Sequence, residues 1–311
     1  MSRFQPFVGM FLRFGSASFE FVPHPLLPQD KEAVFVLEGG EALVYQVRNT
    51  VSRRLYAFKV FKPAYRDERI ARVTAFIACQ PDLPGLDARR ICVTMGNYPE
   101  LVKTFPEVEY ALLMPWIEAQ TWAGVLLNPA IAAQYTFDEA RDLALTTANV
   151  LWNMESRGLA HTDIAGSNVL LSPDHKQIQL LDLEGIYVPG LPAPKKLSQG
   201  TPGYQHHNPG SRGQWCPEGD RFAGAILLTE ILTWWEPRVR AHVADHAESL
   251  FRPDELQVIG QPCWQAVREV LHSIHPKVLS LFDQAWASPT LAACPELATW
   301  AKTLFSLFSP S

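Results

Sequence analysis

The chain has 311 residues, of which 47% are apolar and 19% are charged. This balance suits a packed soluble protein, and the length allows one large domain or two. The net charge is only −5 and no run of Lys or Arg occurs, so we expect no nucleic-acid partner.

The N-terminus and the cysteines bear on location. The apolar stretch Phe7–Phe14 is short and contains Arg13, so it predicts neither a transmembrane span nor a signal peptide. The five cysteines are Cys79, Cys92, Cys216, Cys263 and Cys294. They are scattered, odd in number and never spaced C-x-x-C, which indicates free thiols rather than zinc ligands or disulfides. We therefore expect a cytoplasmic protein without membrane contact.

The first predicted elements are strands. Residues 1–30 are interpreted as an extension that either packs on the core or stays loose. Ala33–Leu37 and Leu43–Val47 are predicted strands, and the turn between them contains Gly39 and Gly40. Leu55–Phe61 is an alternating strand with Lys59 in its middle.

A helix and two further strands follow. The apolar spacing within Asp67–Gln80 predicts a helix, and its only glutamate, Glu68, lies in the first turn. Ile91–Thr94 and Tyr110–Met114 read as strands, and the second leads into Pro115–Glu118. Phe137–Arg157 is a long amphipathic helix that Gly158 ends.

The segment His161–Gly185 carries most of the chemistry. A polar loop with Asp163 and Asn168 precedes the apolar run Val169–Leu171. A turn at residues 173–176 and a second apolar run lead to Asp182. Loop, strand, turn and strand bring Asp163, Asn168 and Asp182 to one end of a hairpin. Two carboxylates and an amide at one place suit a magnesium nucleotide and the hydroxyl that attacks it.

Two later segments complete the pattern. Gly200–Tyr204 reads G-T-P-G-Y, and the histidines that follow, His206 and His207, are predicted to lie in a solvated loop rather than to bind a metal. The apolar run Asp220–Leu232 predicts a helix buried on most sides. Asp220 is expected to cap this helix and to brace the backbone near His161.

These motifs resemble the eukaryotic-like protein kinase superfamily. His161, Asp163 and Asn168 match its loop H-x-D-x-x-x-x-N, and Asp182–Gly185 matches D-F-G as D-L-E-G. The resemblance covers about residues 33–304, and within the superfamily the sequence is similar to divergent bacterial members. It implies an α+β, two-lobed protein kinase-like fold, with a small antiparallel β-rich lobe at residues 31–116 and a larger, mainly helical lobe at residues 117–311.

The resemblance also implies roles for individual residues. Asp163 would orient the substrate hydroxyl, Lys59 would bind the ATP phosphates, and Asn168 and Asp182 would hold Mg²⁺. The threonine of G-T-P-x-Y would help to fix Asp163. The other residues that the resemblance places around ATP are Gly39, Gly40, Ala57, Met114, Trp116, Ile117 and Leu170. For Trp116 and Ile117 the adenine contacts would come from backbone groups.

Some positions depart from the family pattern. Thr162 stands where regulated protein kinases often carry an arginine that receives a phosphate, and Ala165 stands where Ser/Thr kinases carry a lysine near the γ-phosphate. Lys176, Lys195 and Lys196 are the candidates to replace that cation. Whether Glu68 pairs with Lys59 is left open.

The implied activity is an ATP- and Mg²⁺-dependent protein serine/threonine kinase. One alternative is a pseudokinase that binds nucleotide as a scaffold. Another is a small-molecule phosphotransferase of the aminoglycoside or choline kinase type, which usually lacks G-T-P-x-Y. The protein substrate is open. The resemblance suggests a phosphatase or a von Willebrand A-type protein as the partner, and the oligomeric state is not indicated.

Overall fold

The computed structural model describes residues 4–27, 29–30, 32–87, 89–172, 174–243 and 249–308. The chain is α+β and divides into two compact units. Unit 1 consists of residues 1–81, 87–118 and 194–196, and unit 2 of residues 82–86, 119–193 and 197–311. Pro173, the first residue of the predicted turn in the hairpin, lies outside the described residues.

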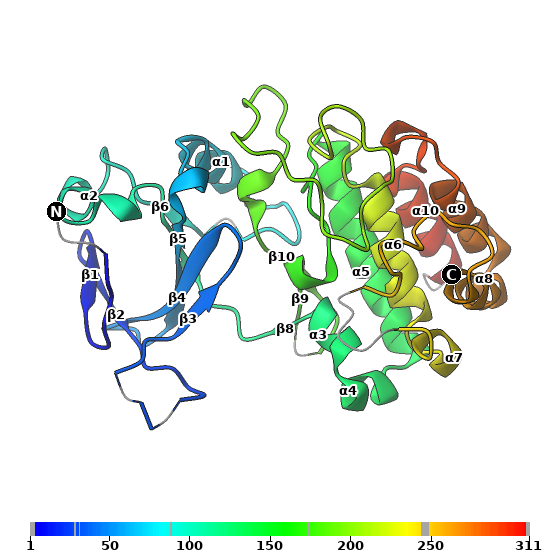
Figure 1. Cartoon of the computed structure of the whole chain (residues 1–311), viewed down its shortest axis with the longest axis horizontal. Helices are drawn as coiled ribbons and strands as arrows, with labels where there is room; N and C mark the ends of the chain where they lie inside the picture. Colours follow the sequence, from blue (N-terminus) through cyan, green and yellow to red (C-terminus); the bar gives the residue numbers. More distant parts are fainter. Residues whose placement is uncertain are drawn as a thin grey trace. The chain divides into compact units, whose positions relative to one another are not determined.

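Unit 1 is built on a curled antiparallel sheet (Figure 1). Its strands are β1 (Phe11–Phe14), β2 (Ala17–Phe21), β3 (Val36–Glu38), β4 (Ala42–Asn49), β5 (Leu55–Phe61), β6 (Ile91–Cys92) and β7 (Leu112–Pro115). The order is β1-β2-β4-β5-β7-β6, and β3 pairs with one half of β4. Residues 11–21, from the segment interpreted as an extension, thus form two strands of this sheet.

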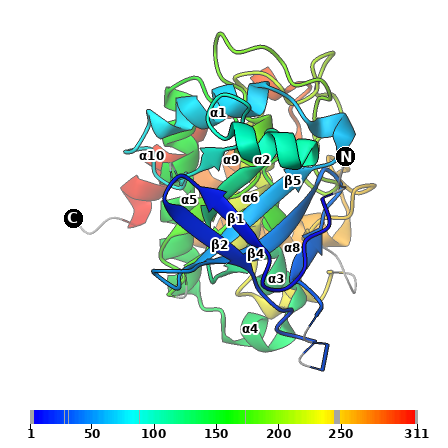
Figure 2. The ribbon, with the colours of Figure 1, turned by 90° about the vertical axis from the view of Figure 1, so that its left-hand side faces the viewer.

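The two faces of this sheet are covered differently. One face buries Val47, Phe58 and Val60 against aromatic side chains of β1 and β2 and against α2 (Pro99–Thr104). Figure 2 shows β1 and β2 in front of the strands β4 and β5, with α2 above them. On the other face, α1 (Arg69–Ala78) packs Ile70 against Phe61. The alternation in the sequence predicts this division, because successive strand residues point to opposite faces.

Unit 2 is mainly helical and carries one small sheet. The sheet contains β8 (Gln120–Thr121), β9 (Val169–Leu171) and β10 (Ile178–Leu180), in the order β10-β9-β8. The helices are α3 (Trp122–Leu127), α4 (Pro129–Gln134), α5 (Phe137–Ser156), α6 (Arg221–Thr233), α7 (Pro237–Arg240), α8 (Pro262–Ile274), α9 (Pro276–Trp286) and α10 (Leu297–Phe308). Short 3-10 turns are η1 (Pro63–Tyr65) and η2 (Pro106–Val108) in unit 1, and η3 (Gly166–Asn168), η4 (Leu183–Gly185) and η5 (Leu291–Ala293) in unit 2.

Helices α5 and α6 pack side by side and form the core of unit 2 (Figure 1). A capping box between Thr136 and Glu139 begins α5, and every residue of α6 after Arg221 is buried. Where α5 ends and α6 begins, the Arg221 guanidinium lies 2.7 Å from a Glu155 carboxylate oxygen. The other Glu155 oxygen accepts a hydrogen bond from the Ala298 N–H of α10. This largely buried pair links α5, α6 and α10 at one point, and no local sequence pattern predicts it.

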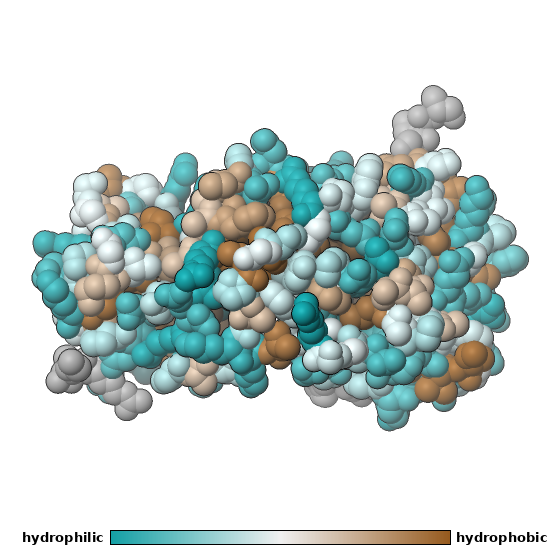
Figure 3. Space-filling model, turned by 90° about the horizontal axis from the view of Figure 1, so that it is seen from above, coloured by the Kyte–Doolittle hydropathy of each residue, from teal (hydrophilic) through white to brown (hydrophobic). Residues whose placement is uncertain are grey.

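Among the described residues, no helix combines the length and the apolar character needed to cross a membrane. On the face seen in Figure 3, hydrophobic residues form small groups separated by hydrophilic ones.

Candidate functional site

The predicted hairpin is present in unit 2, and its polar residues meet at one end. The strand pairing joins Leu180 to Val169, and the next residue, Leu181, donates its N–H to the Asn168 carbonyl at 2.9 Å. The Asn168 side-chain amide donates to the Asp163 carbonyl at 2.9 Å. These contacts bring Asp163, Asn168 and Asp182 to one end of the hairpin, as predicted. Asp182 is exposed there, whereas Asp163 and Asn168 are half-buried.

Asp220 fixes the loop that carries Asp163. Its two carboxylate oxygens accept the backbone N–H groups of His161, at 2.5 Å, and of Thr162, at 2.8 Å. The predicted brace is confirmed. The predicted cap is not, because the Asp220 carboxylate makes no cap hydrogen bond to α6. Burial raises the pKa of Asp220, while the nearby His161 and the two N–H donors favour its charged form.

Thr201 contacts Asp163 directly. The Thr201 hydroxyl donates to Asp163 Oδ1 at 2.9 Å, across 38 residues of sequence. The expected role of this threonine as a partner of Asp163 is therefore confirmed. Tyr204, three residues later, is fully buried and donates to Glu230, so both ends of this short segment are anchored in unit 2.

Two residues of the site have left-handed backbones although neither is glycine. Asp182 has φ of 54° and Thr162 has φ of 72°. The His161 ring nitrogen Nε2 lies 2.5 Å from the Leu181 carbonyl, and the Thr162 hydroxyl donates to the Gly185 carbonyl at 3.2 Å. Such conformations cost free energy and persist only where the surroundings hold them. The loop before the hairpin is therefore bound to the chain on both sides of Asp182.

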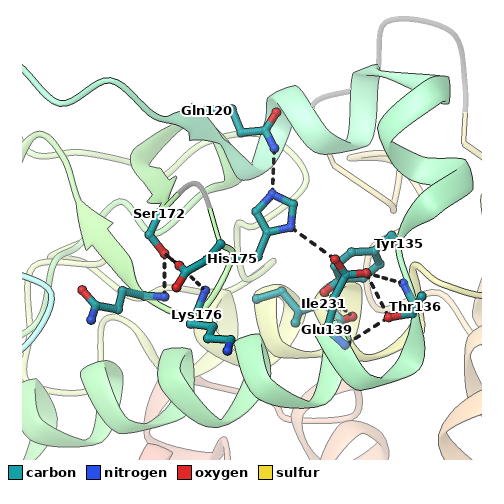
Figure 4. Close-up of polar contacts among 10 residues, drawn as sticks. Gln120, Tyr135, Thr136, Glu139, Ser172, His175, Lys176 and Ile231 are labelled. Carbon is teal, nitrogen blue, oxygen red and sulfur yellow. Dashed lines mark hydrogen bonds and ion pairs between the residues drawn. The ribbon is translucent and has the colours of Figure 1, made fainter.

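The other end of the hairpin is held by a separate set of contacts (Figure 4). His175 in the turn lies 3.0 Å from the Gln120 amide nitrogen of β8 and 3.9 Å from Glu139 of α5. The Lys176 carbonyl accepts from the Thr146 hydroxyl of α5 at 2.9 Å. Lys176 thus lies at the end of the hairpin opposite Asn168, about 10 Å of strand away. It is the wrong candidate for a cation beside Asp163.

Glu230 is a buried centre that the sequence analysis did not assign. It accepts hydrogen bonds from the Trp122 indole at 3.0 Å, the Tyr204 hydroxyl at 2.6 Å and the Leu250 N–H at 2.7 Å. Burial raises the pKa of Glu230 to about 7, although these donors favour the ionised form. The signal was available, since Glu230 is an acidic residue inside an apolar helix, where a charge needs partners.

In unit 1 the strand register gathers other predicted residues on one face. Lys59 pairs with Leu112 and Ala57 pairs with Met114, across β5 and β7. Residues two apart on a strand, and residues paired across a ladder, share a face. Lys59 is only 4% exposed, and its ammonium lies 5.2 Å from the centre of the Phe61 ring. Lysine is almost never this buried unless its ammonium has a partner.

Two further parts of unit 1 are expected to contact the nucleotide: the turn that contains Gly39 and Gly40, and the end of β7. Neither Gly39 nor Gly40 has a positive φ, and a Cβ on Gly40 would meet nothing within 4 Å. At the end of β7 the Trp116 N–H donates to the Leu55 carbonyl at 3.0 Å. The Trp116 N–H is therefore bonded within the sheet, and the expectation that backbone groups near Trp116 bind adenine stays a prediction. The expectation for Ile117 stays a prediction.

Glu68, Lys195 and Lys196 all form polar contacts near the start of α1. Glu68 forms an ion pair with Arg72, one turn later in the helix. Lys195 donates to the Arg66 carbonyl at 3.2 Å, and Lys196 donates to the Tyr65 hydroxyl at 2.6 Å. Both lysines belong to unit 1, and each side chain forms a hydrogen bond on its surface.

The paired histidines behave differently from each other. His207 is exposed, but His206 is buried, with Nε2 3.0 Å from the Ser288 carbonyl and Nδ1 accepting the Asn208 N–H. The expectation of a solvated loop is wrong for His206, because its ring packs edge-on against Phe222 of α6 and contacts Ser288. Desolvation lowers its pKa. Among the described residues, no three His, Cys, Asp or Glu side chains are grouped to hold a metal ion without further ligands.

Comparison with known proteins adds no assignment. No protein-family model matches this sequence, and no curated protein matches it.

Proposed function

We propose that this protein is an ATP- and Mg²⁺-dependent protein serine/threonine kinase with a two-lobed protein kinase-like fold. The observation that carries the proposal is the cluster at one end of the hairpin, where Asp163 is held by Thr201 and lies beside Asn168 and Asp182. Phosphoryl transfer requires a carboxylate to orient the attacking hydroxyl and oxygen ligands for the metal. One short segment of unit 2 supplies both.

Asp163 is the residue that we assign to the substrate hydroxyl. Thr201 donates to Oδ1 and thereby sets the rotation of the carboxylate. We assign Oδ2 as the acceptor for the hydroxyl proton. A fixed carboxylate within hydrogen-bond reach of the nucleophile typically contributes a factor of about 10²–10⁴ to the rate.

The metal ligands that we assign are Asn168 and Asp182. The Asn168 amide nitrogen already donates to the Asp163 carbonyl, which orients its Oδ1 as the acceptor atom. Amide and carboxylate oxygens are hard ligands, and Mg²⁺ is usually held by one or two carboxylates together with phosphate oxygens. The donor set therefore fits Mg²⁺, which when bound would neutralise charge on the phosphates.

Unit 1 supplies the groups that we assign to the nucleotide. Lys59 is the phosphate ligand, Ala57 and Met114 border the adenine, and the Ile117 N–H is its backbone donor. Neither Gly39 nor Gly40 is required by its φ or by a close neighbour. We assign both to a close approach of the backbone to the phosphates, which glycine permits because it has no side chain. Leu170, buried in β9, is the apolar contact that we assign from unit 2.

The segment after Thr201 bears on the class of substrate, because it lies next to Asp163. Tyr204 is bound to Glu230, and the Ser249 hydroxyl donates to the Gly203 carbonyl. A Cβ on Gly203 would lie 2.5 Å from Ser249, so the backbone at Gly203 packs closely against this side chain. A fixed segment directly beside Asp163 supports a protein substrate, because it offers an ordered surface to an extended chain.

The test is transfer of labelled phosphate from Mg·ATP to protein hydroxyls. We expect Asp163→Asn to lower the rate by about 10²–10⁴, while Asp174→Asn, in the turn at the other end of the same hairpin, keeps the wild-type rate. Equal incorporation by wild type and Asp163→Asn would rule the proposal out. Tight binding of Mg·ATP without transfer would instead favour a nucleotide-binding scaffold, and transfer only to small alcohols a small-molecule phosphotransferase.

A further inference from the structure

Thr162 adopts a conformation that its side chain disfavours. Its φ is 72°, and β-branched residues are rarely found in the left-handed region because the branched carbon crowds the backbone. The residue is also 1% exposed. Glycine or asparagine would fit this backbone at lower cost. Backbone propensity therefore does not account for a threonine at this position.

The Thr162 hydroxyl makes a specific contact that does account for it. It donates to the Gly185 carbonyl, 23 residues later, at 3.2 Å, while the Thr162 N–H donates to Asp220. Gly185 ends the η4 turn that begins directly after Asp182. A Cβ on Gly185 would meet the Thr162 hydroxyl at 3.5 Å, an ordinary contact, so the two residues touch without crowding.

The two contacts from His161 and Thr162 bracket Asp182. His161 binds the carbonyl of the residue before Asp182, and Thr162 binds the carbonyl of the third residue after it. Asp182 itself is left-handed, with φ of 54°, and exposed. Its backbone is therefore strained, and the contacts on either side restrict the conformations available to its carboxylate.

We propose that Thr162 is a positioning residue for the metal: its hydroxyl holds the Asp182–Gly185 turn in the conformation that presents the Asp182 carboxylate to Mg²⁺. The role rests on the proposed function, because it concerns the metal that accompanies ATP.

The test compares nucleotide affinity with and without Mg²⁺ in the full-length protein. Thr162→Val keeps the branched shape and removes the donor, whereas Thr162→Ser keeps the donor. We expect Thr162→Val to lower the gain in ATP affinity produced by Mg²⁺ by about fivefold to tenfold, as the loss of one buried hydrogen bond implies. Thr162→Ser should stay within about twofold of wild type. Affinity for metal-free ATP should be the same in all variants. A general loss of structure would lower this affinity as well.

The matched control is Thr146→Val. It removes the same kind of bond, from a threonine hydroxyl to a backbone carbonyl, at the other end of the hairpin. It should leave the effect of Mg²⁺ unchanged. Hydrogen exchange of the nucleotide-free protein gives a second readout. Thr162→Val should raise exchange at the Ile186 and Tyr187 amides, which are bonded to Leu183 and Ala160, and Thr146→Val should not.

The outcomes separate the two proposals. If Mg²⁺ strengthens ATP binding in wild type and equally in Thr162→Val, Thr162 has no positioning role and the kinase proposal stands. If Thr162→Ser fails as Thr162→Val does, shape rather than the hydroxyl matters and the inference is overturned. If Mg²⁺ has no effect on ATP binding in wild type, both proposals fail.

Discussion

The two units position their candidate residues by different means. In unit 1, Ala57, Lys59 and Met114 share a face because β5 pairs with β7 in a regular antiparallel register. In unit 2, Asp163 and Asp182 lie on irregular backbone, which side chains from distant parts of the sequence hold in place, notably Asp220 and Thr201. A ladder tolerates many sequences as long as its alternation is kept. A loop held by single side chains depends on each of them.

This difference predicts where single substitutions have large effects, and the largest is expected at Asp220. Asp220→Ala removes the acceptor for two buried N–H groups, which costs about 3–5 kcal/mol. The loss should be local, so that hydrogen exchange rises at residues 161–168 while the amides of β4 and β5 stay protected. Chemical denaturation gives the total and exchange gives the location.

The control is Asp142→Ala in α5, where the partly exposed carboxylate pairs with Arg141. It should change the free energy of unfolding by less than about 1 kcal/mol. If Asp220→Ala costs no more than this control, the loop is held by the backbone itself, and the contrast between the units disappears.

How much was predictable from the sequence follows the same division. The bounds of β5 agree with the predicted strand, and α5 differs from its prediction by one residue, because period-2 and period-3.6 patterns are local. The hairpin and its three polar residues followed from the same patterns. The hydroxyl bond of Thr162, the three donors to Glu230 and the burial of His206 did not. They join residues that only the packing of distant elements brings together, and no local pattern records them.

The second prediction concerns the ionisation of Glu230. Its pKa is raised to about 7 in the folded protein from an ordinary value of 4.5. The folded state therefore retains a proton that the unfolded chain loses. The stabilisation is complete below about pH 4.5 and disappears as the pH rises through about 7. A shift of this size corresponds to about 3 kcal/mol in the free energy of unfolding.

Glu230→Gln isolates this contribution. The variant cannot ionise, so the difference in unfolding free energy between wild type and variant should vary with pH over that window and be constant above it. His206 acts in the opposite direction, because its lowered pKa makes the folded state less stable as the pH falls below its ordinary value of 6.5. The same His206 contribution is present in both proteins and cancels. A difference that does not vary with pH would show that the pKa of Glu230 is the same in the folded and the unfolded protein.

A smaller effect is expected at Gly85, where the backbone of unit 2 passes close to α5. Its φ is +75°, and a Cβ there would lie 2.6 Å from Val150. Gly85→Ala combines backbone strain with crowding, which should cost about 2–3 kcal/mol in thermal unfolding. Gly190→Ala, with φ of +83° and no neighbour within 4 Å, measures the strain alone at about 1 kcal/mol. Equal losses in the two variants would mean that Val150 moves aside without cost.

The smallest effect on stability is expected at Gly40, and it is the most direct test of the contrast. The fold imposes neither a positive φ nor a close neighbour on Gly40. Gly40→Ala should therefore leave the free energy of unfolding within about 0.5 kcal/mol, or raise it by reducing the entropy of the unfolded chain. If the turn approaches the ATP phosphates, the added methyl group should nevertheless weaken ATP binding. Gly96→Ala is the matched control, since Gly96 also lies in an exposed turn of unit 1 without a positive φ. A loss of ATP affinity in Gly40→Ala alone, at unchanged stability, would show that the ligand rather than the fold requires this glycine. Equal affinity in both variants would remove Gly40 from the nucleotide site.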